Sequence, residues 1–229
     1  MIEKQNKSSI IRMFHVYKHY GAVKALIDIT LDVPKNELLF ISGPSGAGKT
    51  SLLKLLYYGE AASEGQVLID GMNLSRISHH RIPILRRKFG VIFQDYKLIR
   101  TKTVFDNIAV VLEAVGKKRR FVEKKVRSVL RTVGMENSIH SLPPTLSGGE
   151  QQRIAVARAI VGDPKIILAD EPTGNLDEDS ADIILNLLKR FHVRGATVII
   201  ATHDKELIRK TGGRVIHLKQ GRMQTTSIH

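Results

Sequence analysis

The sequence of 229 residues predicts an α/β domain built around a mostly parallel β-sheet. Apolar strand-like runs alternate with helix-like runs near both ends of the chain, which is typical of a parallel sheet flanked by helices. The middle of the chain, roughly residues 95–160, has a helical pattern instead. We therefore expect a helical subdomain inserted into a domain that spans residues 10–229, after a polar N-terminal tail at 1–9.

The first half of the chain supplies strands and two helices. The predicted strands are apolar or loosely alternating runs, found at 23–33, 38–42, 67–69 and 89–93. A helix is expected over 48–58, where a glycine-rich turn opens it. A shorter helical piece is expected near 79–88, between the last two strands.

The rest of the chain changes from helices back to strands. Apolar residues recur at helical spacing between about 103 and 133, at Phe121, Val122, Val126, Val129, Leu130 and Val133. The segment Leu142-Pro143-Pro144 ends this pattern, because proline interrupts a helix. Strands are then expected at 165–169, 196–201 and 214–218.

Composition limits the kinds of protein that the chain can be. A hydrophobic content of 42% is enough for a sizeable core, and the absence of cysteine excludes disulfides and thiolate metal sites. The N-terminus has no apolar segment of the signal-peptide type, so we expect no signal peptide. We also expect no membrane-spanning segment, because no run of about 18 apolar residues is free of charge.

The net charge of +14 is concentrated in the middle of the chain. Residues 76–131 hold 16 lysines and arginines against four acidic residues, which gives this segment a net charge of +12. A patch of this sign suits a nucleic acid or an anionic membrane surface. A solvated helix surface explains any single cluster of these residues equally well.

A phosphate-binding loop is predicted at the segment GPSGAGKT, between a strand and a helix. Its glycines let the backbone bend tightly and turn N–H groups inward, and these donors attract phosphate together with the helix N-terminus. Lys49 is expected to reach the β- and γ-phosphates, and the Thr50 hydroxyl to hold Mg²⁺. The alternative is a glycine turn that only packs. The predicted nucleotide-binding residues are Gly43, Pro44, Ser45, Gly46, Ala47, Gly48, Lys49, Thr50 and Ser51.

Polar residues follow three further predicted strands. Asp170 and Glu171 come directly after the apolar run 166–169, which delivers both carboxylates to the edge where α/β sites lie. Asp170 is predicted to hold Mg²⁺, and Glu171 to polarise a water for attack on the γ-phosphate. Gln94 is a candidate for contact with the metal and the water, and His203 for contact with a phosphate oxygen. Either would be an ordinary loop residue if it stood alone.

A second predicted anion site precedes another helix, at the segment LSGGEQQR. Ser147 and the two following glycines form a helix N-terminus that can accept an anion. A P-loop kinase or a small GTPase has no use for a second phosphate-binding helix end. An N-cap beside a glycine turn would be the simpler interpretation of this stretch in isolation.

Five motifs in this order and spacing resemble the nucleotide-binding subunits of ATP-binding-cassette proteins. They are GPSGAGKT, VIFQD, LSGGEQQR, IILADEPTGNLD and ATHD, and the resemblance covers about residues 10–222. It implies the P-loop fold of this family, with an antiparallel β part beside the parallel sheet and an inserted helical subdomain. It also implies an ATPase that binds ATP and Mg²⁺ and releases ADP and phosphate.

The resemblance further implies a head-to-tail homodimer that forms with ATP and encloses two ATP molecules. Tyr20 is expected to stack on adenine, and Asp177 to belong to a loop that signals across the dimer. Each ATP would lie between the phosphate loop of one copy and the LSGGE segment of the other, at Ser147, Gly148, Gly149 and Glu150.

Within the family, the segments ADEPTGNLD, VIFQDYKLI and TVFDNIA are most similar to a small bacterial group of ATPases. That group serves cell division, lipoprotein release and macrolide export, and the short chain favours the cell-division member. The expected partner is then an integral membrane protein of the FtsX type, with this chain cytoplasmic and peripheral on the inner face of the membrane. The alternatives are an export ATPase and a soluble ATPase that acts on DNA or ribosomes. No nucleic acid is expected, because such soluble proteins usually carry two cassettes or long coiled-coil insertions.

Overall fold

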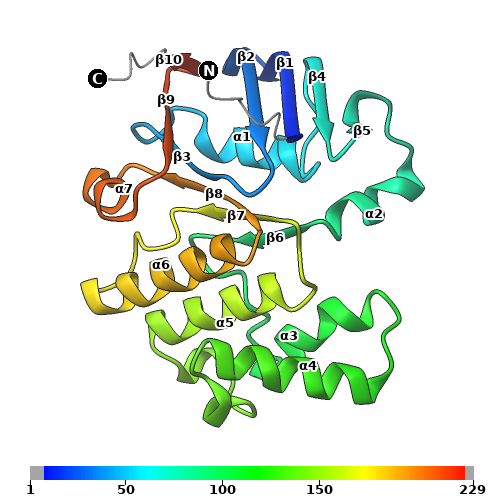
Figure 1. Cartoon of the computed structure of the whole chain (residues 1–229), viewed down its shortest axis with the longest axis vertical. Helices are drawn as coiled ribbons and strands as arrows, with labels where there is room; N and C mark the ends of the chain where they lie inside the picture. The colour runs from blue at the N-terminus through cyan, green and yellow to red at the C-terminus, as the bar shows by residue number, and fades with distance from the viewer. Residues whose placement is uncertain (1–7, 225–229) are drawn as a thin grey trace, which may run out of the picture.

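The larger of two β-sheets forms the core of the protein (Figure 1). The computed structural model describes residues 8–224. Neighbouring strands of this sheet are parallel, except that β10 runs antiparallel to β9, so the predicted parallel core is confirmed. In the spatial order β10-β9-β3-β8-β7-β6, the strands are β10 (Arg222–Gln224), β9 (Arg214–Lys219), β3 (Leu38–Ser42), β8 (Thr197–Thr202), β7 (Ile166–Asp170) and β6 (Phe89–Ile92).

The smaller sheet has four antiparallel strands in the order β2-β1-β4-β5. These strands are β1 (Ser9–Tyr20), β2 (Val23–Pro34), β4 (Glu64–Ile69) and β5 (Met72–Asn73). The expectation of an antiparallel part is confirmed. Residues 1–7 of the predicted tail lie outside the described residues. Ser9, the last residue of the predicted tail, already belongs to β1 and pairs with Pro34 of β2.

Helix α1 (Lys49–Leu56) lies between the two sheets and contacts strands of both (Figure 1). Its buried leucines share one apolar core with β1, β2 and β3. The helix predicted over 48–58 is therefore present, although it ends before Tyr57. The other helices beside the sheets are α2 (Ile82–Arg86), α6 (Glu178–Val193) and α7 (Lys205–Thr211).

Helices α3 (Val104–Glu113), α4 (Arg119–Thr132) and α5 (Gly148–Ile160) lie between β6 and β7 in the chain. They occupy the end of the molecule farthest from the antiparallel sheet (Figure 1). The helical pattern predicted over about 103–133 corresponds to two helices, α3 and α4, because the chain turns at Gly116 with a φ of 72°. Among the described helices, none combines the length and the apolar character that crossing a bilayer requires.

The order of the parallel strands brings three loops together. Strand β8 lies between β3 and β7, and all three run in the same direction. Their carboxyl ends, at Ser42, Asp170 and Thr202, therefore lie at one edge of the sheet. The glycine-rich loop, Glu171 and His203 follow these ends directly, so residues far apart in the sequence meet there.

Candidate functional site

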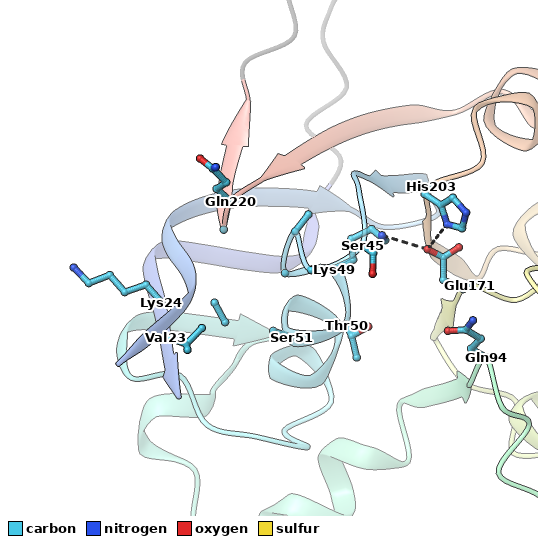
Figure 2. Close-up of a pocket in the computed structure, with 15 residues that line it drawn as sticks. Val23, Lys24, Ser45, Lys49, Thr50, Ser51, Gln94, Glu171, His203 and Gln220 are labelled. Carbon is cyan, nitrogen blue, oxygen red and sulfur yellow. Dashed lines mark hydrogen bonds and ion pairs between the residues drawn. The ribbon is translucent and has the colours of Figure 1, made fainter. Parts of the chain in front are cut away.

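A hollow of about 430 Å³ lies at the carboxyl edge of the parallel sheet (Figure 2). Most of the predicted phosphate loop and three of the predicted polar residues line it. The complete lining consists of Val23, Lys24, Ala25, Ser45, Gly46, Ala47, Gly48, Lys49, Thr50, Ser51, Gln94, Glu171, His203, Gln220 and Gly221.

The glycine-rich loop passes so close to the antiparallel sheet that a side chain would not fit at one position. Gly48 has a φ of 105°, and a Cβ built on it would lie 2.6 Å from the Ala25 carbonyl oxygen. Helix α1 begins at the next residue, Lys49. Residues 49–51 of its first turn line the hollow, and N–H groups at a helix start have no intrahelical partner, so this position favours an anion.

Lys49, Glu171 and His203 form a charged cluster in the hollow (Figure 2). Lys49 Nζ lies 3.2 Å from Glu171 Oε1, and His203 Nδ1 lies 3.0 Å from the same oxygen. Lys49 is buried and also donates to the Gly43 carbonyl oxygen at 2.8 Å. The backbone of Glu171 has a φ of 44°, an uncommon value for a residue other than glycine, and its N–H donates to Ala201 at 2.8 Å. The ammonium group of Lys49, the imidazole of His203 and the carboxylate of Glu171 are thus held together just after the end of β7.

Asp170, Thr50 and Gln94 meet on the other side of the loop, where Thr50 and Gln94 line both this hollow and a second one of about 640 Å³. Burial raises the pKa of Asp170, while a hydrogen bond from Thr50 lowers it and the neighbouring charge of Glu171 raises it further. Asp170 Oδ1 is buried and has no hydrogen-bond partner among the described residues. A carboxylate oxygen without a partner, beside a hydroxyl and an amide, fits the oxygen ligands that Mg²⁺ prefers.

Five residues of the lining were not predicted: Val23, Lys24, Ala25, Gln220 and Gly221. The first three begin β2, and the last two form the turn between β9 and β10. Two hydrogen bonds fix this turn. Gly221 N donates to the Ala47 carbonyl oxygen at 3.1 Å, and Ile27 N donates to the Gly221 carbonyl oxygen at 2.7 Å. No sequence motif marks these positions, since they reach the site only through sheet pairing.

Tyr20, the predicted adenine contact, lies beside the hollow and is not part of its lining. It is 40% exposed, and its hydroxyl is 3.5 Å from Ser51 Oγ. Lys18 Nζ lies 4.8 Å from the centre of its ring. A hydrogen bond from Tyr20, together with those from Lys54 and Lys18, lowers the pKa of Glu60 to about 2. The ring is thus positioned at the rim, next to the first turns of α1.

The LSGGE segment forms a capped helix start outside the hollow. Ser147 Oγ accepts from Glu150 N at 3.3 Å, and Glu150 Oε2 accepts from Ser147 N at 2.8 Å, which makes a capping box. Hydrogen bonds to its carboxylate from the backbone and then the side chain of Ser147 lower the pKa of Glu150. Neither residue, nor Gly148 or Gly149, lines the hollow that contains Lys49.

Helix α6 begins against the same segment. A Cβ on Gly149 would collide with the Ser180 side chain, so the glycine allows close approach of the two helix starts. Asp177 caps α6 by accepting from Ser180 N at 2.9 Å. Asp177 is therefore near the LSGGE segment, and it too lies outside the lining of the hollow. The predicted site residues form two groups on one chain.

Comparison with known proteins gives a consistent result. A family model described as "ABC transporter" matches residues 26–174. The cell division ATP-binding protein FtsE of Streptococcus pneumoniae is 45% identical over 94% of each chain. The protein of the same name from Bacillus subtilis is 43% identical over 93% of each chain. The one from Escherichia coli is 41% identical over 93% of this chain and 97% of its own length. The predicted similarity to the cell-division group is confirmed.

Two solved structures have the same fold. One is described as the dimeric structure of MJ0796, a bacterial ABC transporter cassette, with a TM-score of 0.87 and 34% identity. The other is a dimeric post-hydrolysis state of MJ0796 bound to ADP and Pi, with a TM-score of 0.88 and 32% identity. Each match covers 94% of this chain and 97% of the other.

Proposed function

Since this chain belongs to the ABC transporter family, we propose that it is the ATP-hydrolysing subunit of a membrane complex that acts in cell division. Its similarity to FtsE proteins over nearly the whole chain supports this role over lipoprotein or macrolide export. The observation that carries the proposal is the cluster of Lys49, Glu171 and His203 beside the phosphate loop.

Each residue of the cluster has a part in hydrolysis. The N–H groups of the loop and Lys49 would bind the phosphates, because charge-assisted hydrogen bonds to phosphate are strong. Glu171 would accept a proton from the attacking water, and His203 would hold a γ-phosphate oxygen. Thr50, Asp170 and Gln94 would hold Mg²⁺, which supplies neutralisation of phosphate charge when it is bound. Tyr20 would stack on the adenine from the rim.

Two copies would complete each site between them. The LSGGE segment has a capped helix start and lies outside the hollow of its own chain, so it is available to a phosphate held by another copy. We propose a head-to-tail homodimer in which Ser147, Gly148, Gly149 and Glu150 of one copy contact the ATP held by the loop of the other. Asp177 would lie at this contact. The dimeric MJ0796 structures support the arrangement.

The remaining part of the proposal concerns the membrane. We propose that the segment at about 95–160 is a helical subdomain and that ATP-driven closure of the dimer moves an integral membrane partner of the FtsX type. The chain would then be peripheral on the cytoplasmic face of the membrane. The names of the FtsE relatives support a cell-division role, and the choice of partner rests on the resemblance to that group.

Replacing Lys49 by alanine tests the proposed nucleotide site. The affinity for ATP should fall roughly ten- to hundredfold, because a charge-assisted hydrogen bond is lost. Isothermal titration calorimetry measures the affinity, and Lys205→Ala is a matched control because Lys205 is exposed on α7 and outside the hollow. Equal affinities for the wild type and Lys49→Ala would contradict the assignment of the loop.

A further inference from the structure

Four cations form a row along the outer face of α4. Arg120, Lys124, Arg127 and Arg131 recur at intervals of four, three and four residues, which places them on one face of the helix. All four are exposed. We call these four residues the α4 row.

The cations of the α4 row form no ion pair with any residue that the structure describes. Within residues 8–224, the ion pairs of α4 are Arg119 with Glu123 at 3.0 Å and Lys125 with Asp163 at 2.7 Å, and no residue of the row takes part in either. The row therefore presents four charges to its surroundings.

The sequence of α4 works against the stability of the helix itself. Like charges three and four residues apart repel one another along the row. The first turn of α4 contains no acidic residue, and its N-cap, Lys118, makes no side-chain capping hydrogen bond. Positive charge at this end also opposes the helix dipole. A negatively charged partner along the outer face would relieve both kinds of repulsion.

The orientation of the row is fixed by the opposite face of α4. Val122, Val126, Val129 and Leu130 are buried in the core that α4 shares with α3 and α5. The helix therefore cannot rotate to expose them, as a free amphipathic helix would at a membrane. The row therefore stays on the exposed face of α4, a helix at the end of the molecule farthest from the antiparallel sheet (Figure 1).

An exposed aromatic ring lies at the N-terminal end of the row. Phe121 is 47% exposed, and Lys117 Nζ lies 5.6 Å from the centre of its ring. An aromatic ring beside basic side chains is the combination that favours the interface between lipid headgroups and hydrocarbon. A surface with these properties suits a flat anionic layer.

We propose that the α4 row, with Lys117 and Phe121 at its end, binds the anionic lipid surface of a membrane. The choice of a membrane rests on the proposed function, which brings the chain to a membrane partner. Direct lipid contact would fix the position of the helical end of the molecule, so that closure of the dimer moves the partner relative to the lipid surface.

Vesicle co-sedimentation tests this proposal with the full chain. One set of vesicles contains equal parts of phosphatidylglycerol and phosphatidylcholine, and the other contains phosphatidylcholine alone. The wild type should bind only the first set, and less at high salt. A variant with Gln at all four positions of the row should bind these vesicles at least about tenfold more weakly, because each basic residue near such a surface strengthens binding roughly fivefold.

The chain offers a matched control with the same change of charge. Lys35, Arg190, Lys205 and Arg222 are exposed and, among the described residues, form no ion pair, so their replacement by Gln should leave vesicle binding nearly unchanged. A second variant with Lys at positions 120, 127 and 131 keeps the charge and should bind like the wild type. Circular dichroism should show the α4-row Gln variant to be folded and at least as heat-stable as the wild type, because repulsion is removed.

Several outcomes would overturn the proposal. The proposal is wrong if the wild type and the α4-row Gln variant bind anionic vesicles equally well. It is also wrong if the control variant loses as much vesicle binding as the α4-row Gln variant does. Retention of the wild type on duplex DNA without any vesicle binding would assign the row to nucleic acid instead.

Phosphate release from ATP should be the same in the wild type and the α4-row Gln variant. Its absence from both would contradict the proposed ATPase and leave vesicle binding to decide this proposal separately.

Discussion

At the residue scale, one carboxylate oxygen of Glu171 is shared between two nitrogen atoms. Lys49 Nζ and His203 Nδ1 lie 3.2 and 3.0 Å from it. In the proposed site the phosphates of ATP would compete for Lys49, since they carry more negative charge than one carboxylate. We expect ATP to draw Lys49 away and to leave Glu171 free to accept a proton from water.

Replacing Glu171 by glutamine should separate hydrolysis from ATP binding. Glutamine has the same size but cannot accept the proton, so the rate of phosphate release should fall roughly 10²- to 10⁴-fold. ATP affinity should stay the same or increase, because Lys49 loses a competing partner. Both quantities are measured on the purified chain, by a phosphate-release assay and by calorimetry.

Glu206→Gln provides the control for this substitution. Glu206 is an exposed residue of α7 that pairs with Arg209 at 3.5 Å, outside the hollow. Its replacement should change neither hydrolysis nor affinity. Hydrolysis by Glu171→Gln at the wild-type rate would remove Glu171 from the proposed role.

The sequence predicts the residues of the cluster one by one, but not their contacts. Lys49 is marked by its loop, and Glu171 by the apolar strand before it. Their ion pair depends on the position of β8 between β3 and β7, which no local pattern contains. The same holds for Gln220, because pairing of β9 with β3 brings it to the hollow.

At the element scale, Asp70 joins the two sheets. It follows β4 and forms ion pairs with Lys88, just before β6, and with Lys165, just before β7, the latter at 2.9 Å. Hydrogen bonds from Lys165 and Lys88 lower the pKa of Asp70 from 3.8 to about 2. The side chains of Asp70 and Lys88 are only 16% and 18% exposed, so solvent weakens this pair little, whereas Lys165 is 61% exposed and its pair is weakened more. The antiparallel sheet is thus attached to the edge of the parallel one.

Replacing Asp70 by asparagine should lower the free energy of unfolding near neutral pH by roughly 1–2 kcal/mol. The folded state lowers the pKa of this carboxyl, so its stabilisation is fully present above pH 3.8 and is lost as the pH falls through about 2. The difference in free energy of unfolding between the wild type and the variant should therefore shrink as the pH falls from 3.8 through about 2. Urea unfolding at several pH values measures it.

Asp163→Asn is the matched control, because Asp163 also pairs with a lysine but its side chain is 76% exposed. Exposed ion pairs contribute little, so this variant should unfold almost like the wild type. A difference for Asp70→Asn that stays constant down to the lowest pH would show that its carboxylate charge does not join the sheets.

Two elements show why local patterns miss part of the fold. Strand β1 has register shifts between Met13 and Val16, where His15 has a φ of 46°, so the alternation of buried and exposed residues is interrupted. Apolar spacing continues across the break at Gly116, because α3 and α4 both face the same core. Helix α5 was easier to predict, since its Ser147 and Glu150 form a capping box visible in the sequence.

At the scale of the whole molecule, the predicted site residues fall into two groups that one copy does not bring together. The phosphate loop and Glu171 line one hollow, whereas the LSGGE segment and Asp177 lie outside it. Head-to-tail pairing of two copies would place the phosphate loop and Glu171 of each copy against the LSGGE segment and Asp177 of the other. The central claim is therefore that neither copy has a complete ATPase site alone.

The most direct measurement of this claim is the mass of Glu171→Gln in solution, by size-exclusion chromatography with light scattering. With Mg-ATP the variant should be a dimer, because in the proposed mechanism ATP would close the pair and the missing hydrolysis could not open it. With ADP it should be a monomer. Adding Ser147→Arg to the same chain should keep it monomeric with Mg-ATP while ATP still binds, because the larger cation blocks the contact with the other copy's ATP. A dimer that forms equally well in the double variant, or a Glu171→Gln chain that binds ATP and stays monomeric, would contradict the claim.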